Sequence, residues 1–130
     1  MAPTGFPATT GDIFTAADYN GLVTFDVKAD QTADYTIVLA DSYQVLIPMN
    51  KATAVNLSIP TNASAAIPVG SVITVLNKGA GAVTIKAVTS GTTTVLSAGA
   101  VAAQPTLAQY KSAACIKTGT DTWYVVGAVG

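Results

Sequence analysis

The stretch IPVGSVITVLNKGAGAVTIKAV, residues 67–88, predicts two β-strands joined by a tight glycine loop. In the first strand, residues 72–76 alternate between two faces that are both largely apolar, whereas residues 83–86 alternate between an apolar and a polar face. The loop between them offers Gly79 and Gly81 for backbone conformations with positive φ. Two alternating runs separated by a short glycine-containing loop are typical of a β-hairpin.

Similar short runs continue on both sides of this stretch. TAVNLSI at residues 53–59 alternates most regularly, and Pro48 limits the preceding strand to a sheet edge or a bulge. The chain closes in a second predicted hairpin, KSAACIKT and TWYVVGAV around the turn TGTD at 118–121. The other predicted strands lie within residues 24–34, 35–40, 44–49 and 92–97. The expected fold is therefore all-β, an antiparallel β-sandwich or barrel-like domain of about 8–9 short strands.

A different kind of segment precedes these strands. Residues 1–12 are punctuated by proline and glycine, which predicts an extended arm. Residues 13–23 predict one short helix, which Thr15 caps and Gly21 ends. We expect residues 1–34 to form the arm, the helix and a connecting strand, and residues 35–130 to form the β-sandwich domain.

The composition is rich in small and apolar residues and poor in charge. Half of the 130 residues are hydrophobic and 10% are charged, against about 25% charged in an average soluble domain. Threonine, serine, alanine and glycine take the place of the missing charged residues, which favours strands because threonine and valine pack well in a sheet. Neither a membrane-spanning run nor a signal peptide is expected from the pattern.

The charge is divided unevenly along the chain. Residues 1–41 carry a net charge of −5 and residues 42–130 a net charge of +4. This asymmetry either has no role beyond solubility or lets the acidic front contact a basic surface of a partner or a neighbouring copy. The chain has no arginine and its lysines do not cluster, so nucleic-acid binding is not expected.

The residue types that carry most enzyme and metal chemistry are scarce. The chain contains no histidine, no glutamate and one cysteine, so we expect no catalytic residue, no metal site and no cofactor. Asp26, Asp30 and Asp34 are spaced by four residues, but they fall in a strand and turn pattern and are interpreted as solvated. Cys115 is expected to be a small buried residue of a strand.

Several short motifs occur in an order that resembles a β domain of tailed-bacteriophage virion proteins, especially tail-fibre and spike chains. The front piece GDIFTAADYNGL also resembles a segment of phage structural proteins. The resemblance covers about three-quarters of the chain, and its order is more specific than any one motif. The motifs are YTIVLAD at 35–41, Ile59-Pro60, Pro68-Val69-Gly70, Gly79-Ala80-Gly81 and Asp121-Thr122-Trp123.

The resemblance implies a non-enzymatic virion structural protein, located on the capsid surface rather than the tail. Fibre chains usually carry this domain at the end of a longer polypeptide, whereas here a short arm precedes it, which favours a capsid decoration (cement) protein. The alternative is a tail-fibre or spike component that binds a host-surface glycan. The implied partners are the major capsid protein or another virion protein and further copies of this chain, with a trimer favoured, and neither nucleic acid nor membrane. The residues expected to contact a partner are Pro3, Phe6, Pro7, Ile13, Phe14 and Tyr19.

Overall fold

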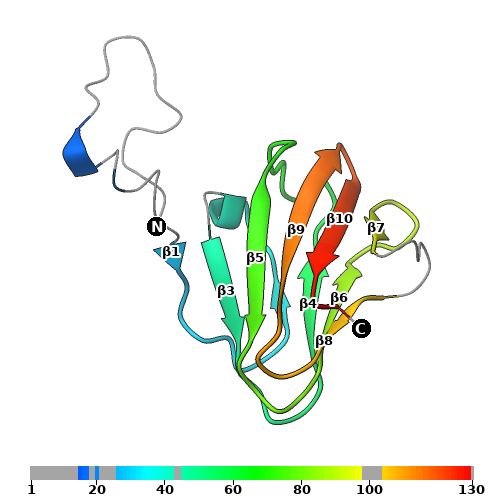
Figure 1. Ribbon diagram of the computed structural model, residues 1–130. Helices are drawn as coiled ribbons and strands as arrows, with labels where there is room; N and C mark the ends of the chain where they lie inside the picture. Colours follow the sequence, from blue (N-terminus) through cyan, green and yellow to red (C-terminus); the bar gives the residue numbers. More distant parts are fainter. Residues whose placement is uncertain (1–14, 18–19, 21–25, 43–44, 98–103, 130) are drawn as a thin grey trace.

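The computed structural model describes residues 15–17, 20, 26–42, 45–97 and 104–129, which form a two-layered β structure (Figure 1). One sheet has six strands in the order β1-β3-β5-β9-β10-β7, and the other has four in the order β2-β4-β6-β8. The elements are β1 (Asp26–Val27), β2 (Tyr35–Thr36), the 3-10 helix η1 (Leu39–Ser42), β3 (Val45–Met49), β4 (Val55–Ile59), β5 (Val72–Asn77), β6 (Val83–Ala87), β7 (Thr94–Leu96), β8 (Thr106–Leu107), β9 (Ser112–Gly119) and β10 (Thr122–Gly127).

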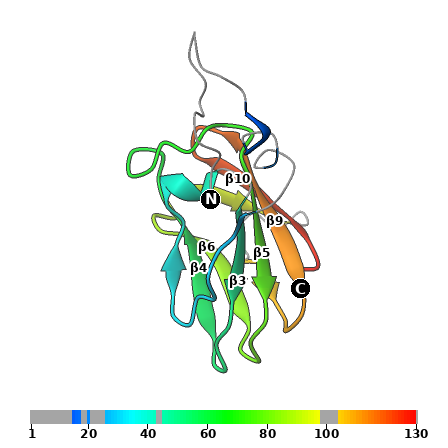
Figure 2. The ribbon, with the colours of Figure 1, turned by 90° about the vertical axis from the view of Figure 1, so that its left-hand side faces the viewer.

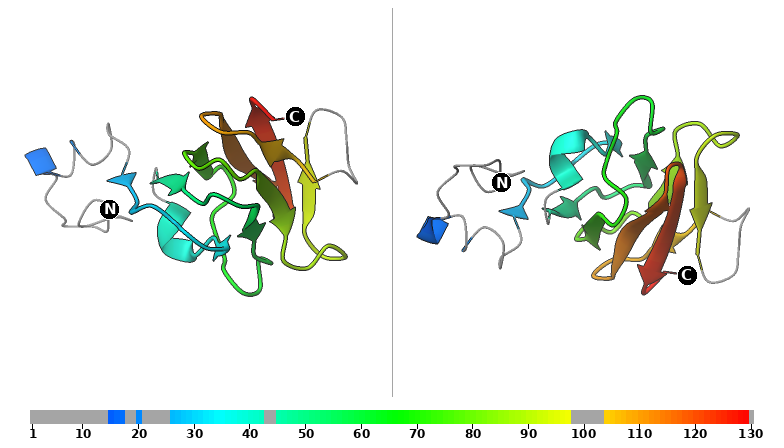
Figure 3. Two further views of the ribbon diagram at one scale, coloured as in Figure 1. Left: turned by 90° about the horizontal axis from the view of Figure 1, so that it is seen from below. Right: turned by 90° about the horizontal axis from the view of Figure 1, so that it is seen from above.

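The first six strands wind alternately through the two sheets. The odd-numbered strands β1, β3 and β5 lie side by side in the six-stranded sheet, and β2, β4 and β6 lie side by side in the four-stranded sheet. Neighbours within each set are therefore parallel. Figure 2 shows the two sheets as separate layers, and the end views in Figure 3 show the chain crossing between them.

This winding corrects the predicted hairpin at residues 67–88 and the expectation of a purely antiparallel sandwich. β5 belongs to the six-stranded sheet and β6 to the four-stranded sheet, so they are not hydrogen-bonded partners. Each strand turns an apolar row inward, with Val75 and Ile85 fully buried. Because the two rows cover opposite sides of one core, the chain between β5 and β6 crosses from sheet to sheet. Antiparallel pairing occurs at β5–β9, β9–β10 and β6–β8.

Within β1–β6, three connections lead from the six-stranded to the four-stranded sheet, and we call them arches: residues 28–34, 50–54 and 78–82. They lie at one end of the sandwich and stack on one another through backbone hydrogen bonds. The Asn50 N–H donates to the carbonyl of Gln31 at 2.8 Å, and the Gly81 N–H donates to the carbonyl of Lys51 at 3.0 Å.

The third arch needs its two glycines because the backbone of the neighbouring arch lies close to them, and not because they adopt a positive φ. Gly79 and Gly81 are not among the glycines with positive φ in the described residues. Instead, a Cβ atom at Gly79 would overlap the backbone of Lys51, and one at Gly81 would overlap the carbonyl of Thr53. The glycine-rich loop predicted as a hairpin tip is therefore the surface on which the neighbouring arch packs.

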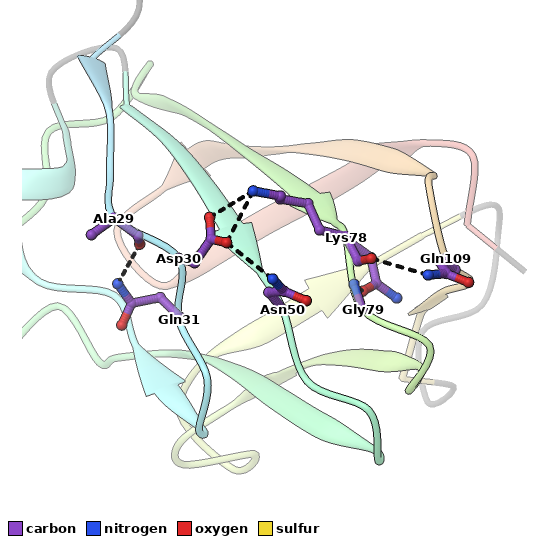
Figure 4. A network of polar contacts seen from close by, with 8 residues as sticks. Ala29, Asp30, Gln31, Asn50, Lys78, Gly79 and Gln109 are labelled. Carbon is purple, nitrogen blue, oxygen red and sulfur yellow. Dashed lines mark hydrogen bonds and ion pairs between the residues drawn. The ribbon is translucent and has the colours of Figure 1, made fainter.

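A polar ladder joins the three arches across their outer side (Figure 4). Lys78 of the third arch forms an ion pair with Asp30 of the first at 2.9 Å, and Asn50 of the second donates its side-chain amide to the same carboxylate at 3.0 Å. The hydrogen bond from Lys78, followed by that from Asn50, lowers the pKa of Asp30. The side chain of Gln109, from the loop after β8, donates to the carbonyl of Lys78.

The predicted C-terminal hairpin is confirmed as β9 paired antiparallel with β10. Trp123 and Val125 face the core and Tyr124 and Val126 face outward, as their alternation predicts. Cys115 is fully buried, and this burial raises the pKa of its thiol to about 12. The thiol is thus a small core group in the described structure, as expected.

Two other local predictions are corrected. The sequence predicts one strand over 35–40, but β2 covers only Tyr35–Thr36. After one more backbone hydrogen bond, from the Ile37 N–H to the Ser58 carbonyl, the chain enters η1 at Leu39. Pro48 was expected at an edge or a bulge, yet β3 lies between β1 and β5. The N–H that proline lacks would point to the same side as its carbonyl, which is the β1 side, beyond the end of β1, so no ladder hydrogen bond between strands is lost. The Pro48 carbonyl itself accepts a hydrogen bond from the Gln31 N–H at 2.8 Å.

Candidate functional site

The residues predicted to contact a partner lie outside the described residues. They are Pro3, Phe6, Pro7, Ile13, Phe14 and Tyr19. The helix predicted over 13–23 falls mostly outside them as well, although Ala16, Ala17 and Asn20 are helical and exposed. This N-terminal segment joins the body at β1, an edge strand of the six-stranded sheet.

The described feature best suited to binding another protein is the outer face of the six-stranded sheet. The registers place its side chains in three rows across neighbouring strands, and none of these side chains is charged. We call this surface the charge-free face. Its rows are Val72, Ile116, Tyr124 and Leu96; Val27, Leu46, Thr74, Ala114 and Val126; and Pro48, Leu76 and Ser112.

Several large side chains of the charge-free face stand in solvent. Val72, Tyr124 and Val126 are 41%, 44% and 49% exposed, and Val27 at the edge is 63% exposed. Soluble monomers rarely expose a contiguous apolar patch of this kind without using it for an interaction. The charge-free face is therefore our candidate interaction site, and β3, β5, β9 and β10 present it toward the viewer in Figure 1.

The absence of charge is specific to this side of the sandwich. The strands of the six-stranded sheet do contain Asp26 and Lys117, but Asp26 pairs in register with inward-facing Val45, and Lys117 is only 2% exposed on the core side. The outer face of the four-stranded sheet is polar instead. Its rows are Asn56, Thr84 and Thr106, and Thr36, Ser58 and Lys86.

Beside the first arch, at η1, a buried carboxylate organises the first motif of the phage resemblance. Asp41 is 1% exposed and accepts hydrogen bonds from the Tyr35 hydroxyl at 2.6 Å, the Lys28 ammonium at 3.1 Å and the Val38 N–H at 3.0 Å. Burial and then the bond to Asp41 raise the pKa of Tyr35. Burial acts to lower the pKa of Lys28, but its bonds to Asp41 and Tyr35 outweigh this and raise it.

The last motif of the resemblance, Asp121-Thr122-Trp123, also has a structural role. The Asp121 carboxylate accepts a hydrogen bond from the Asn62 N–H at 2.8 Å and from the Thr93 hydroxyl at 3.3 Å, which ties the β9–β10 turn to two other loops. Beside it, buried Lys117 donates to the Asn62 side chain and to the Ile67 carbonyl, both at 2.7 Å. Burial lowers the pKa of Lys117.

The polar groups in these centres form hydrogen bonds with one another. Among the residues that the structure describes, no buried side-chain polar atom lacks a hydrogen-bond partner. In the same residues, no three histidine, cysteine, aspartate or glutamate side chains come together as a possible metal site. Asp30 and Asp34, expected to be solvated, are exposed but engaged, Asp34 with the backbone N–H of Asn56 at 2.9 Å. Of the helices in the described part, none is long and apolar enough to cross a membrane.

One further surface residue stands apart from these centres. Tyr110 is 79% exposed and is the non-glycine residue with positive φ, 66°, in the described chain. Its N–H donates to the carbonyl of Asn77 at 2.6 Å, which fixes the residue where the loop after β8 meets the third arch. Such a conformation costs energy for a bulky residue, so the exposed ring is a feature to be explained.

Comparisons of the chain with protein-family models, with curated proteins and with solved structures found no match.

Sequence reasoning missed the charge-free face as a site, although part of its signal was visible. Residues 72–76 are apolar on both faces, which predicts a strand that is covered on both sides. In the described structure only one side of β5 is covered, by the core. The excess apolar face of this strand is the signal that points to a further contact.

Proposed function

We propose that this protein is a non-enzymatic structural component of a tailed-bacteriophage virion, and that it decorates the outside of the capsid shell. The observation that carries the proposal is the charge-free face, an uncharged and largely apolar surface of the kind that proteins use for contacts with other proteins. The ordered motifs that resemble phage virion domains are what favours a virion as the assembly to which the chain belongs. The major capsid protein or another virion protein is the proposed partner, together with further copies of the chain, in which the resemblance favours a trimer.

In this proposal residues 1–23 bind the shell and the sandwich forms an outward knob. The segment is suited to this because it combines Phe6, Ile13 and Phe14 with two acidic residues and no basic residue. It enters the body at the edge strand β1, so it can reach a neighbouring surface without opening the core. Binding to assembled shells and not to free subunits stabilises the shell by mass action.

Deletion of residues 1–12 is expected to leave a folded domain that no longer binds particles. The core lies entirely between Ile37 and Val125, so removal of the segment takes away no core residue of the described structure. Co-sedimentation with purified particles measures binding, and circular dichroism verifies the fold. Full-length protein with Thr84→Lys, on the polar face of the other sheet, is the matched control and should still bind.

Particle binding by the deletion variant at the full-length level would contradict a role for these residues. A point variant, Phe6→Asp, separates a specific contact from a simple loss of chain length. We expect it to weaken co-sedimentation while the free protein keeps its melting temperature.

A tail-fibre or spike component that binds a host glycan is the second candidate, and Tyr110 is the observation that favours it. An exposed ring held in a costly conformation is suited to stack on the apolar face of a sugar. The side-chain oxygen of Gln109 and the ammonium of Lys111 are adjacent in sequence and could add polar contacts. Saturable sugar binding that Tyr110→Ala abolishes would favour this function over decoration.

A further inference from the structure

We propose that the charge-free face is a self-association surface, and that the same face of a second copy of this chain covers it. The pairing rests on the described residues of the face alone. Its role in strengthening a shell rests on the proposed function.

The continuity of the middle row supports a flat contact. Val27, Leu46, Thr74, Ala114 and Val126 are register partners across five neighbouring strands of the sheet. Their side chains project from one side of the sheet because paired residues in a β ladder share a face. The row runs from the β1 edge to β10 without a charged or large polar side chain.

The lack of charge on the face indicates which surface can cover it. If a charged surface bound here, its charged side chains would lose their water and would have no oppositely charged partner on this face. Burying unpaired charges in this way costs free energy. The partner must therefore be apolar and uncharged over the same extent. The other described surfaces of this chain carry charges, including Lys86 on the four-stranded sheet and the Asp30–Lys78 pair on the arches. Of these surfaces, the charge-free face itself is the one that fits.

The size of the face sets the expected strength. Neighbouring strands are about 4.8 Å apart and rise about 3.3 Å per residue. The strand pairs of this sheet match between two and six residues, so the patch is on the order of 300 Å². Two such patches together bury roughly 600 Å² when the patches are treated as flat, which is below the ~1,200 Å² at which stable interfaces begin. Pairing is therefore expected to depend on concentration and to be strengthened where copies are held close together.

The geometry of such a contact is two-fold. A surface that binds its own copy makes an isologous interface, which relates two chains by a two-fold axis. It is thus a contact additional to the three-fold contact of the trimer that the resemblance implies. Assemblies formed through this face contain an even number of copies.

Sedimentation velocity of the isolated full-length protein over a range of concentrations tests the inference. We expect the unaltered protein to shift from a smaller to a doubled species as concentration rises. Val126→Lys places a charge in the middle row, and we expect it to raise the dissociation constant of that step by at least about tenfold. Thr84→Lys, which points outward from a central strand of the other sheet, is the matched control and should leave the step unchanged.

Tyr124→Lys provides a second, independent variant in case one substitution disturbs folding. Both substituted side chains are more than 40% exposed, so the melting temperature should change little. An unaltered protein that never doubles, or a doubling that both lysine variants leave intact, would overturn the inference. Because no particle is present, either result is independent of shell binding. Loss of particle binding in the deletion variant would still support the proposed function.

Discussion

Gly81→Ala is expected to destabilise the fold by at least about 3 kcal/mol, or to prevent folding. The added methyl group would overlap the carbonyl oxygen and carbon of Thr53 in the neighbouring arch. Both partners are backbone, so no side-chain rotation can relieve the overlap. The arches must move apart, which breaks the hydrogen bond from the Gly81 N–H to the Lys51 carbonyl.

Urea unfolding followed by tryptophan fluorescence measures this loss, because Trp123 is 1% exposed in the core. Gly91→Ala is the matched control, since a Cβ atom there meets no atom within 4 Å and its φ is not positive. We expect the control to be neutral or slightly stabilising, because alanine reduces the entropy of the unfolded chain. Equal unfolding free energies for the two variants would mean that the arches are not stacked as described.

Asp41→Ala is expected to destabilise the fold by about 3 kcal/mol, because it removes one buried acceptor from three donors. The Val38 N–H loses its partner within the turn that ends β2, and the Tyr35 hydroxyl loses a 2.6 Å hydrogen bond. Lys28 keeps access to water, since its side chain is 32% exposed, which limits the cost of leaving it unpaired.

Tyr35→Phe separates the contribution of one donor from that of the whole centre. It removes the hydroxyl but leaves Asp41 paired with Lys28 and Val38, so we expect a loss of about 1 kcal/mol. Chemical denaturation of the two variants measures the difference. A loss in Asp41→Ala no larger than in Tyr35→Phe would contradict the role of this carboxylate as the shared acceptor.

The positions of most strands could be predicted from the sequence because alternation reports burial directly. Val55, Leu57 and Ile59 alternate in the sequence and are all buried in β4. The same holds for Trp123 and Val125 in β10. In both segments the side chains that decide the structure are those of the strand itself.

The pairing of the strands could not be predicted in the same way. A five-residue glycine loop can close a hairpin or cross between sheets, and the choice depends on residues far away in the sequence. Here the backbone of residues 51–53 packs against Gly79 and Gly81. Similarly, β2 ends early because Asp41 folds back to Tyr35, a side-chain contact that alternation does not report.

The candidate site was only partly predictable for a related reason. The apolar excess of residues 72–76 is visible in the sequence, but the charge-free face exists only once β1, β3, β5, β9 and β10 are placed side by side. Its rows combine residues as distant as Val27 and Val126. The N-terminal contacts predicted from composition remain predictions, because they lie outside the described residues.

The central claim is that this chain decorates a phage capsid, and the copy number per particle tests it most directly. Quantitative mass spectrometry of purified virions would compare this protein with the major shell protein. Decoration predicts a near-stoichiometric ratio, because each repeat of the shell offers a binding site. A ratio far below this, as for a tail or vertex component, or absence of the protein from purified virions, would contradict the claim.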